Sequence, residues 1–173
     1  MVRNKFVEAL VGIITEFPKM ILVAFDRDSF FHKNLRMIGI DPKTAYFGFK
    51  NLERRKLLTS KNGKLNFTPK GKTWIQICRY KNLKIHNDKW DRKWRIIIFD
   101  IPESLKNQRK QLRRKLKLLG FFNLQKSVLV CPFSCEAEIN FLADYLKIKP
   151  HLNIIMADCI GEREKEVKMF FGL

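Results

Sequence analysis

Apolar side chains in the first part of the chain recur at helical spacing. Intervals of four, three and four residues separate Phe6, Leu10, Ile13 and Phe17, which places them on one face of an amphipathic helix. A second, shorter helix is predicted within "RDSFFHKNLRMIGI", residues 27–40, which has apolar positions of its own. The apolar run between these two helices fits either a helix or a strand.

The stretch "DPKTAYFGFKNLERRKLL" has the clearest helix start in the chain. Asp41 is a favourable N-cap, and Pro42 falls at the first helical position, where its missing N–H costs nothing. Ala45, Phe49 and Leu52 then follow at the spacing of an inward face. We therefore predict a third helix whose other side chains mostly face outward, namely Lys43, Thr44, Tyr46, Phe47, Lys50, Arg54 and Arg55.

A basic hairpin is predicted directly after this helix. Asn62-Gly63 is a strong hairpin signal, because both residue types tolerate the positive φ of a type I′ turn. Short strands are expected on either side, over residues 57–60 and 64–68. Lys56 lies where helices before such a hairpin often end in glycine, and a left-handed lysine would cost about 1 kcal/mol there. The order of these elements predicts a winged helix-turn-helix.

The second half of the chain alternates strands and helices. "WRIIIFD" is a strand pattern, and the leucine-lined helix that follows ends naturally at Gly120. "SVLVCPF" and "NIIMADC" are further strands, with a helix capped by Ser134 between them, while "VKMFFGL" fits an edge strand or a tail. A β-α-β-β-α-β order is typical of a ferredoxin-like sandwich.

These patterns predict an α+β protein with two domains. We expect a winged helix-turn-helix DNA-binding domain over residues 1–78, a polar linker over residues 79–90 and a ferredoxin-like domain over residues 91–173. The composition is 46% hydrophobic, which allows a core and excludes a disordered chain.

The charge of the chain indicates a polyanionic partner. Its formal net charge is +18, and both halves are basic, which favours double-stranded DNA. Charged residues interrupt the most apolar stretch, so no membrane partner is expected. With four cysteines and no signal peptide, the chain is expected in the reducing cytoplasm. No cofactor is needed for DNA binding.

Each basic element can be given a role in DNA binding. On the third helix, base edges in the major groove would face Lys43, Thr44, Tyr46, Phe47 and Lys50. Phosphates would be held by Arg54, Arg55, Lys61 and Lys64, and nucleic acid would also contact Arg109 and Arg113 on the basic helix of the second domain, without sequence preference. The plainer alternative is that these residues form solvated basic helix faces.

Three segments carry a resemblance to a known family. "WDRKWRIIIFDIPE", the basic helix after it and "LGFFNLQKSVLVCPF" resemble the central domain of PaaX-type repressors, and "FTPKG" after the hairpin fits the same order. That central domain in turn resembles the small CRISPR adaptation endonuclease. The resemblance implies a dimeric, sequence-specific transcriptional regulator whose second domain pairs two chains. PaaX-type proteins have a further C-terminal domain, which we expect to be absent here.

An alternative function, as a metal-dependent nuclease, depends on Asp100. By the same resemblance, it occupies the position of the metal-binding aspartate of the adaptation endonuclease, at the end of the first strand of the second domain. A magnesium site would then need Asp100 from both chains of a dimer. The chain would be a metal-dependent nuclease, or a non-catalytic adaptor, beside a CRISPR integrase. We favour the interpretation that Asp100 caps the "IPES" turn by accepting backbone N–H groups, and we favour regulation over catalysis.

Overall fold

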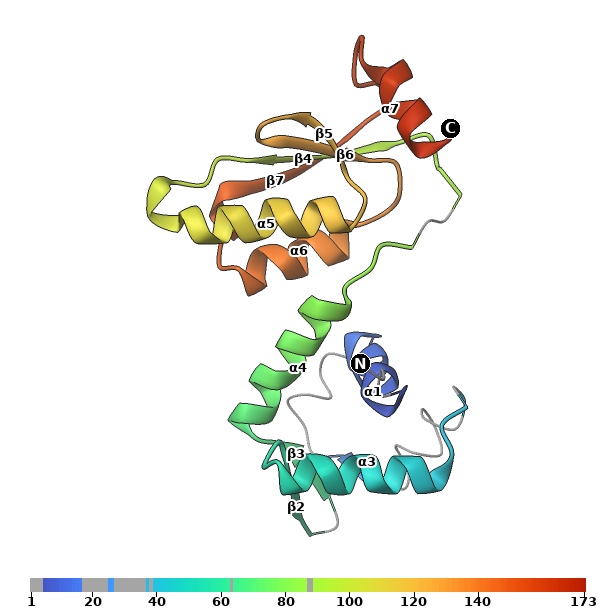
Figure 1. Ribbon diagram of the computed structural model, residues 1–173, viewed down its shortest axis with the longest axis vertical. Helices are drawn as coiled ribbons and strands as arrows, with labels where there is room; N and C mark the ends of the chain where they lie inside the picture. The colour runs from blue at the N-terminus through green and yellow to red at the C-terminus, as the bar shows by residue number, and fades with distance from the viewer. Residues whose placement is uncertain (1–4, 17–24, 27–36, 38, 63, 87–88) are drawn as a thin grey trace. The chain divides into compact units, whose positions relative to one another are not determined.

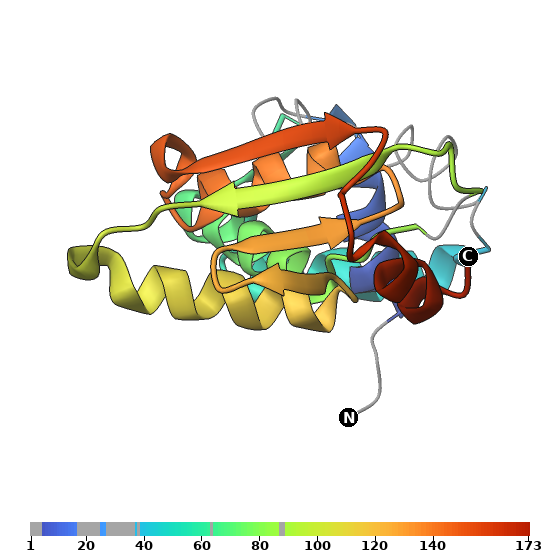
Figure 2. The ribbon, with the colours of Figure 1, turned by 90° about the horizontal axis from the view of Figure 1, so that it is seen from above.

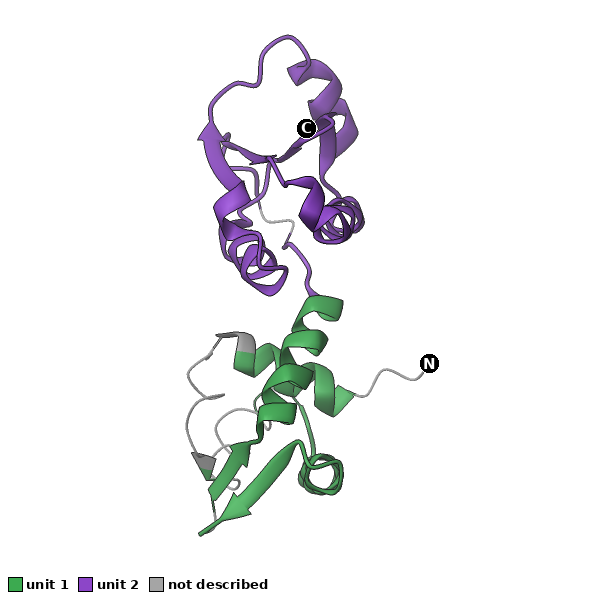
Figure 3. Cartoon of the chain, turned by 90° about the vertical axis from the view of Figure 1, so that its left-hand side faces the viewer, with its two compact units in different colours: residues 1–82 green, residues 83–173 purple. Residues whose placement is uncertain are grey.

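The computed structural model describes residues 5–16, 25–26, 37, 39–62, 64–86 and 89–173. It divides into two compact units, residues 1–82 and 83–173 (Figure 3). Phe17, Gly63 and nearly all of the helix predicted over residues 27–40 lie outside the described residues. Within the described part of the chain, no helix is both long enough and apolar enough to cross a bilayer.

Unit 1 combines helices with a small antiparallel sheet (Figure 1). Its elements are α1 (Lys5–Glu16), β1 (Phe25–Asp26), α3 (Pro42–Arg54), β2 (Leu58–Lys61), β3 (Lys64–Phe67) and α4 (Pro69–Asn82), and its sheet order is β1-β3-β2. Phe6 of α1 meets Phe49 of α3 edge to face, with ring centroids 5.1 Å apart. The predicted inward faces of α1 and α3 are buried together in this core.

The motif "FTPKG" has a local physical role at the start of α4. Thr68 Oγ1 accepts a hydrogen bond from Gly71 N at 3.0 Å and donates to Lys56 O at 2.8 Å, so it joins α4 to the end of α3. A Cβ on Gly71 would lie 1.9 Å from Leu57 O, so only glycine permits this approach of the two backbones. From this anchored start α4 continues to Asn82, four residues into the stretch predicted as linker.

Unit 2 has the β-α-β-β-α-β order that the sequence predicts. The elements are β4 (Trp94–Phe99), α5 (Lys106–Leu118), β5 (Phe122–Gln125), β6 (Val128–Cys131), α6 (Glu136–Tyr145) and β7 (Leu152–Ala157), with α7 (Glu164–Phe171) after them. The four strands pair antiparallel in the order β5-β6-β4-β7. Helices α5 and α6 cover one face of the sheet (Figure 2).

The interpretation of "VKMFFGL" as a strand or tail is wrong, because most of it forms α7. Glu164 and Lys168 form an ion pair at 2.7 Å one turn apart, and Gly172 ends the helix with φ 70°. Val167 is buried against Trp94 and Val130, on the sheet face opposite α5 and α6. The packing of Val167 and Phe171 against this cluster favours a helix over a strand in this segment.

A buried arginine joins the start of β4 to α6. Arg95 is only 5% exposed, and its guanidinium donates to both carboxylate oxygens of Asp91, at 2.6 and 2.8 Å. It also donates to Glu136 Oε1 at 3.0 Å. The hydrogen bond from Arg95 lowers the pKa of Asp91 to about 2.

The N-cap residue of α6 is Cys135, and no side chain among the described residues caps this helix. The predicted Ser134 cap is wrong, because its hydroxyl donates to Glu136 Oε2 at 2.8 Å, and the same oxygen accepts from Cys135 N at 2.9 Å. Partial burial would raise the pKa of Glu136, but these hydrogen bonds and the one from Arg95 outweigh it and lower the pKa to about 2.

Strand β7 forms an edge of the sheet. It pairs with β4 on one side, and within the described residues no strand pairs with its other side. Ile155 is 45% exposed and Met156 is 62% exposed along this strand.

Candidate nucleic-acid interface

Helix α3 begins and packs as its sequence predicts. Thr44 N donates to Asp41 Oδ1 at 2.9 Å, and hydrogen bonds from the side chain and the backbone of Thr44 lower the pKa of Asp41. Pro42 is the first helical residue, and Ala45, Phe49 and Leu52 are buried. The inward face of α3 is thereby fixed against the core, so the opposite face is presented to solvent.

Gly48 explains how closely α1 and α3 approach. A Cβ on Gly48 would lie 2.3 Å from the ring of Phe6, so the ring rests directly on the backbone of α3. This residue was not among those predicted from the sequence. The available signal was a glycine inside a helix, which costs about 1 kcal/mol relative to alanine and usually has a packing reason.

The outward face of α3 combines cations with exposed aromatic rings. Phe47 is 59% exposed and Tyr46 is 46% exposed, and their rings meet edge to face with centroids 5.6 Å apart. Lys50 lies 6.0 Å from the Tyr46 ring and pairs with Glu53 at 3.5 Å. Lys50 is the exposed partner of this ion pair, so its ammonium group stays available to another anion. The remaining exposed residues that the sequence placed on this helix are Lys43, Thr44, Arg54 and Arg55.

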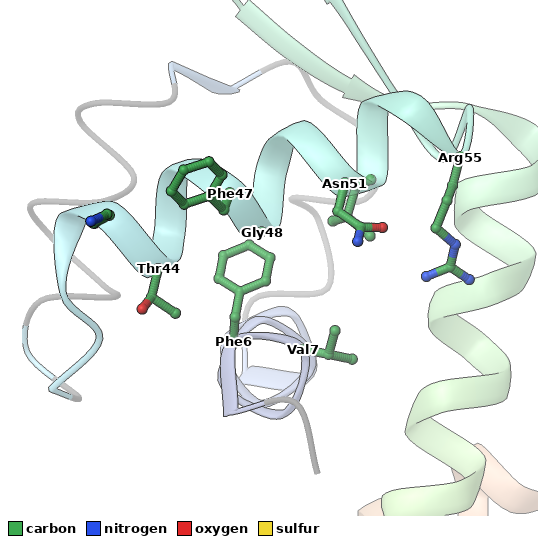
Figure 4. A pocket seen from close by; sticks show the side chains of 9 residues that line it. Phe6, Val7, Thr44, Phe47, Gly48, Asn51 and Arg55 are labelled. Atoms are coloured by element: carbon green, nitrogen blue, oxygen red, sulfur yellow. The ribbon is translucent and has the colours of Figure 1, made fainter. Parts of the chain in front are cut away.

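Arg55 differs from the other predicted contacts because it turns toward α4. Its guanidinium carbon lies 5.4 Å from the centroid of the Trp74 ring, and Figure 4 shows the side chain extending alongside α4. Such a cation–π contact stabilises the junction of the two helices by about 0.5–1 kcal/mol at an exposed site. Arg55 therefore has a packing role, and the outward face of α3 is defined by the residues before it.

A cavity of about 450 Å³ lies between α1 and α3, beside this face (Figure 4). Phe6 and Val7 line it from α1, while Lys43, Phe47 and Asn51 line it from α3. The last three residues are spaced by four, so they form one row along the helix. Asn51 is exposed and was not among the predicted residues, although its position in this row was a usable signal.

The hairpin places two lysines side by side at its tip. Lys61 of β2 and Lys64 of β3 are direct cross-strand partners, and Asn62 in the turn has φ 52°. Both lysines are exposed. Like charges directly opposite each other destabilise a strand pair, and Lys64 is also opposite Asp26 of β1, which offsets part of this repulsion. A polyanion bound at the tip would relieve the remainder.

In unit 2, α5 presents a basic face lined by Lys106, Arg109, Lys110 and Arg113. Arg109 is partly committed to structure, because it donates to Ile101 O at 2.9 Å and pairs with Glu103. Arg113 is exposed. The two arginines that the sequence assigned to nucleic acid therefore differ, and Arg113 is the better candidate for phosphate contact.

Asp100 lies exposed immediately after β4. Its backbone N–H donates to His151 O at 3.0 Å. The expected capping role is wrong, because the carboxylate accepts no hydrogen bond within the described part of the chain, and the short 3-10 helix Glu103–Leu105 begins at Pro102 without a side-chain cap. Among the described residues, no cluster of three or more His, Cys, Asp or Glu side chains could hold a metal ion.

Comparison with known families agrees with the arrangement of unit 2. Residues 87–169 match the family model of the PaaX protein central Cas2-like domain. The matched segment lies wholly within unit 2, so it is unit 2 that is similar to this domain. No curated protein matches the chain.

Proposed function

We propose that this chain is a PaaX-like transcriptional regulator that binds double-stranded DNA with sequence preference and acts as a homodimer in the cytoplasm. In this proposal unit 1 is a winged helix-turn-helix, with α3 as the recognition helix and the β2–β3 hairpin as the wing. The family match of unit 2 supports the regulatory class.

The outward face of α3 is the observation that carries the proposal. An α-helix with its side chains is about 10–12 Å across, which fits the major groove of roughly 12 Å. Lys43, Phe47 and Asn51 lie in one row on this helix, and Lys50 lies beside them. Base edges require donors, acceptors and apolar contacts, and this face offers all three.

Phosphate contacts would supply most of the affinity. Lys61 and Lys64 at the hairpin tip and Arg54 at the end of α3 are exposed cations near the proposed recognition helix. The net charge of +18 adds a long-range attraction to any polyanion. We expect these contacts to position the protein without selecting a sequence.

Unit 2 would pair two copies of the chain. Dimeric DNA-binding proteins of this class read two half-sites related by the symmetry of the dimer. We therefore expect a palindromic site, and sedimentation of the free protein should give twice the mass of 20.6 kDa.

Fluorescence anisotropy with duplex DNA at several salt concentrations tests the binding itself. If about six or more phosphates are contacted, affinity should fall roughly a thousandfold or more between 50 and 200 mM salt, because counterions are released on binding. Selection from a random pool should then yield a defined motif. A salt-independent affinity would contradict the proposal that the protein binds nucleic acid. Binding without an enriched sequence motif would contradict the proposal that it is a sequence-specific regulator.

Variants on the two basic helices test the assignment of roles. Lys43→Ala with Lys50→Ala should weaken the selected site more than random DNA, because each good base contact contributes about 1–3 kcal/mol of discrimination. Lys110→Ala with Arg113→Ala on α5 is the matched control, and it should weaken both DNAs alike or have no effect. If only the variants on α5 changed the sequence preference, unit 2 and not α3 would recognise the DNA sequence.

A second candidate function is divalent-metal-dependent nucleic-acid cleavage. Its supporting observation is that the exposed Asp100 carboxylate accepts no hydrogen bond from the described chain, which leaves it available as a ligand. Two copies would each contribute Asp100 to one magnesium ion. Cleavage by wild type with magnesium or manganese that vanishes in Asp100→Asn, with an unchanged melting temperature, would favour this function. If neither wild type nor Asp100→Asn cleaves nucleic acid, the nuclease function is contradicted and the proposal of a transcriptional regulator stands.

A further inference from the structure

Phe47 has an exposure that is unusual for its residue type. Burying a phenylalanine side chain stabilises a protein by about 1.5–3 kcal/mol, so leaving a ring 59% exposed forgoes a large part of that. The ring lies in the middle of α3, outside the core that the described residues form, and it borders the cavity between α1 and α3. Such exposure, on a helix face that also carries cations and the exposed Tyr46 ring, indicates that the ring contacts a partner.

The neighbours of Phe47 indicate what that partner offers. Lys43 lies one turn before it and Asn51 one turn after it, in the same row, and both also border the cavity beside α3 (Figure 4). The edge of the Tyr46 ring supports Phe47 from the side. An apolar surface flanked by a cation and an amide matches a ligand with a small apolar group among anionic and hydrogen-bonding groups.

In the DNA major groove, that apolar group is the C5-methyl of thymine. It is the only methyl group that the unmodified base pairs display there, and apolar side chains such as Phe make contact with it. We propose that Phe47 is a specificity-determining residue that recognises a thymine methyl group. The inference rests on the proposed function, because it requires α3 to enter the major groove.

Replacing thymine with deoxyuridine tests this contact directly, because it removes the methyl group and keeps base pairing. The wild-type full-length chain would be titrated against its selected site, with each thymine replaced in turn. Burial of one methyl group is worth ~0.8 kcal/mol, so one or two positions should show about fourfold weaker binding. Phe47→Ala should bind the thymine and deoxyuridine duplexes equally, and Phe47→Leu should keep part of the difference.

Met169→Ala is the control, because it removes an exposed apolar side chain of α7, outside the proposed recognition helix, and should leave the thymine-to-deoxyuridine ratio unchanged. Equal binding of all deoxyuridine duplexes by wild type would overturn the inference while the proposed function stands. A thymine preference that persists in both Phe47 variants would overturn the assignment to this residue. Absence of any salt-dependent duplex binding would instead overturn the proposed function. Thermal melts identify a variant that fails to fold. If Phe47→Ala fails to fold, the ratio of thymine to deoxyuridine binding in Phe47→Leu tests the assignment to this residue.

Discussion

Lys56 holds a left-handed backbone conformation, with φ 56°, between α3 and β2. This conformation is needed because the chain must turn back at Lys56 for Leu57 N to donate to Leu52 O at 2.9 Å. Lysine tolerates this conformation poorly, and glycine tolerates it without a Cβ penalty. Lysine in place of glycine at this position therefore lowers the stability of the fold locally.

Lys56→Gly should raise the free energy of unfolding by up to about 1 kcal/mol, because it removes the Cβ strain. Chemical denaturation measures the change. Lys56→Ala is the matched control, since it removes the same charge and keeps the Cβ, and it should stay within about 0.5 kcal/mol of wild type. Equal effects of the two variants would show that the charge, and not the backbone, matters.

The Arg95 cluster predicts a stability that depends on pH. Because the pKa of Asp91 falls to about 2 in the folded chain from its ordinary value of 3.8, Asp91 stabilises the fold fully above about pH 4. Its contribution is lost as pH falls toward 2, where the carboxyl protonates in the folded state as well. Glu136 acts in the same direction, with a pKa also lowered to about 2.

Asp91→Asn should lower the melting temperature at pH 6, and the difference from wild type should shrink as pH approaches 2. Thermal melts across this range measure it. Asp144→Asn is the control, because Asp144 forms only an exposed ion pair with Lys149 at 3.4 Å, which contributes little. A constant difference between Asp91→Asn and wild type would contradict the linkage.

At the scale of single elements, local signals decided what the sequence could predict. The start of α3 follows from Asp41 and Pro42, and its inward face follows from spacing, so both agree with the structure. Helix α7 was missed because its identity depends on Val167 packing against Trp94, a contact that is distant in sequence. Ser134 carried the usual signal of a cap, but its hydroxyl donates to the longer Glu136 side chain, which also accepts from Cys135 N, and α6 has no side-chain cap.

The hairpin tip couples stability to the proposed binding. Lys61→Glu would convert the like-charged pair with Lys64 into an opposite-charged pair, which should stabilise unit 1 by about 0.2–1 kcal/mol. The same change should weaken DNA binding and reduce its salt dependence, because a phosphate contact is lost. Denaturation and anisotropy measure the two effects. Lys61→Gln separates loss of charge from its reversal, and unchanged binding in both variants would exclude the tip from the interface.

At the scale of the whole molecule, the sequence predicted the order of elements better than the chemistry of the candidate site. The alternation of unit 2 and its match to a known domain rest on long, regular patterns. The positions of Arg55 and Arg109 could not be predicted, because an arginine on a helix surface looks the same whether it stacks on Trp74 or faces solvent. Which cations remain available depends on neighbours distant in sequence.

The free edge of β7 has a consequence for handling the protein. The strand carries no charged residue from Leu152 to Ala157, and lysine or proline on an edge is what normally prevents strand addition. At low ionic strength a net charge of +18 keeps copies apart, but at 1 M salt the screening length is only about 3 Å. Salt used to strip nucleic acid should therefore promote edge-to-edge aggregation, measurable by light scattering. Met156→Lys should suppress it, whereas Met169→Lys, on the exposed side of α7, should not.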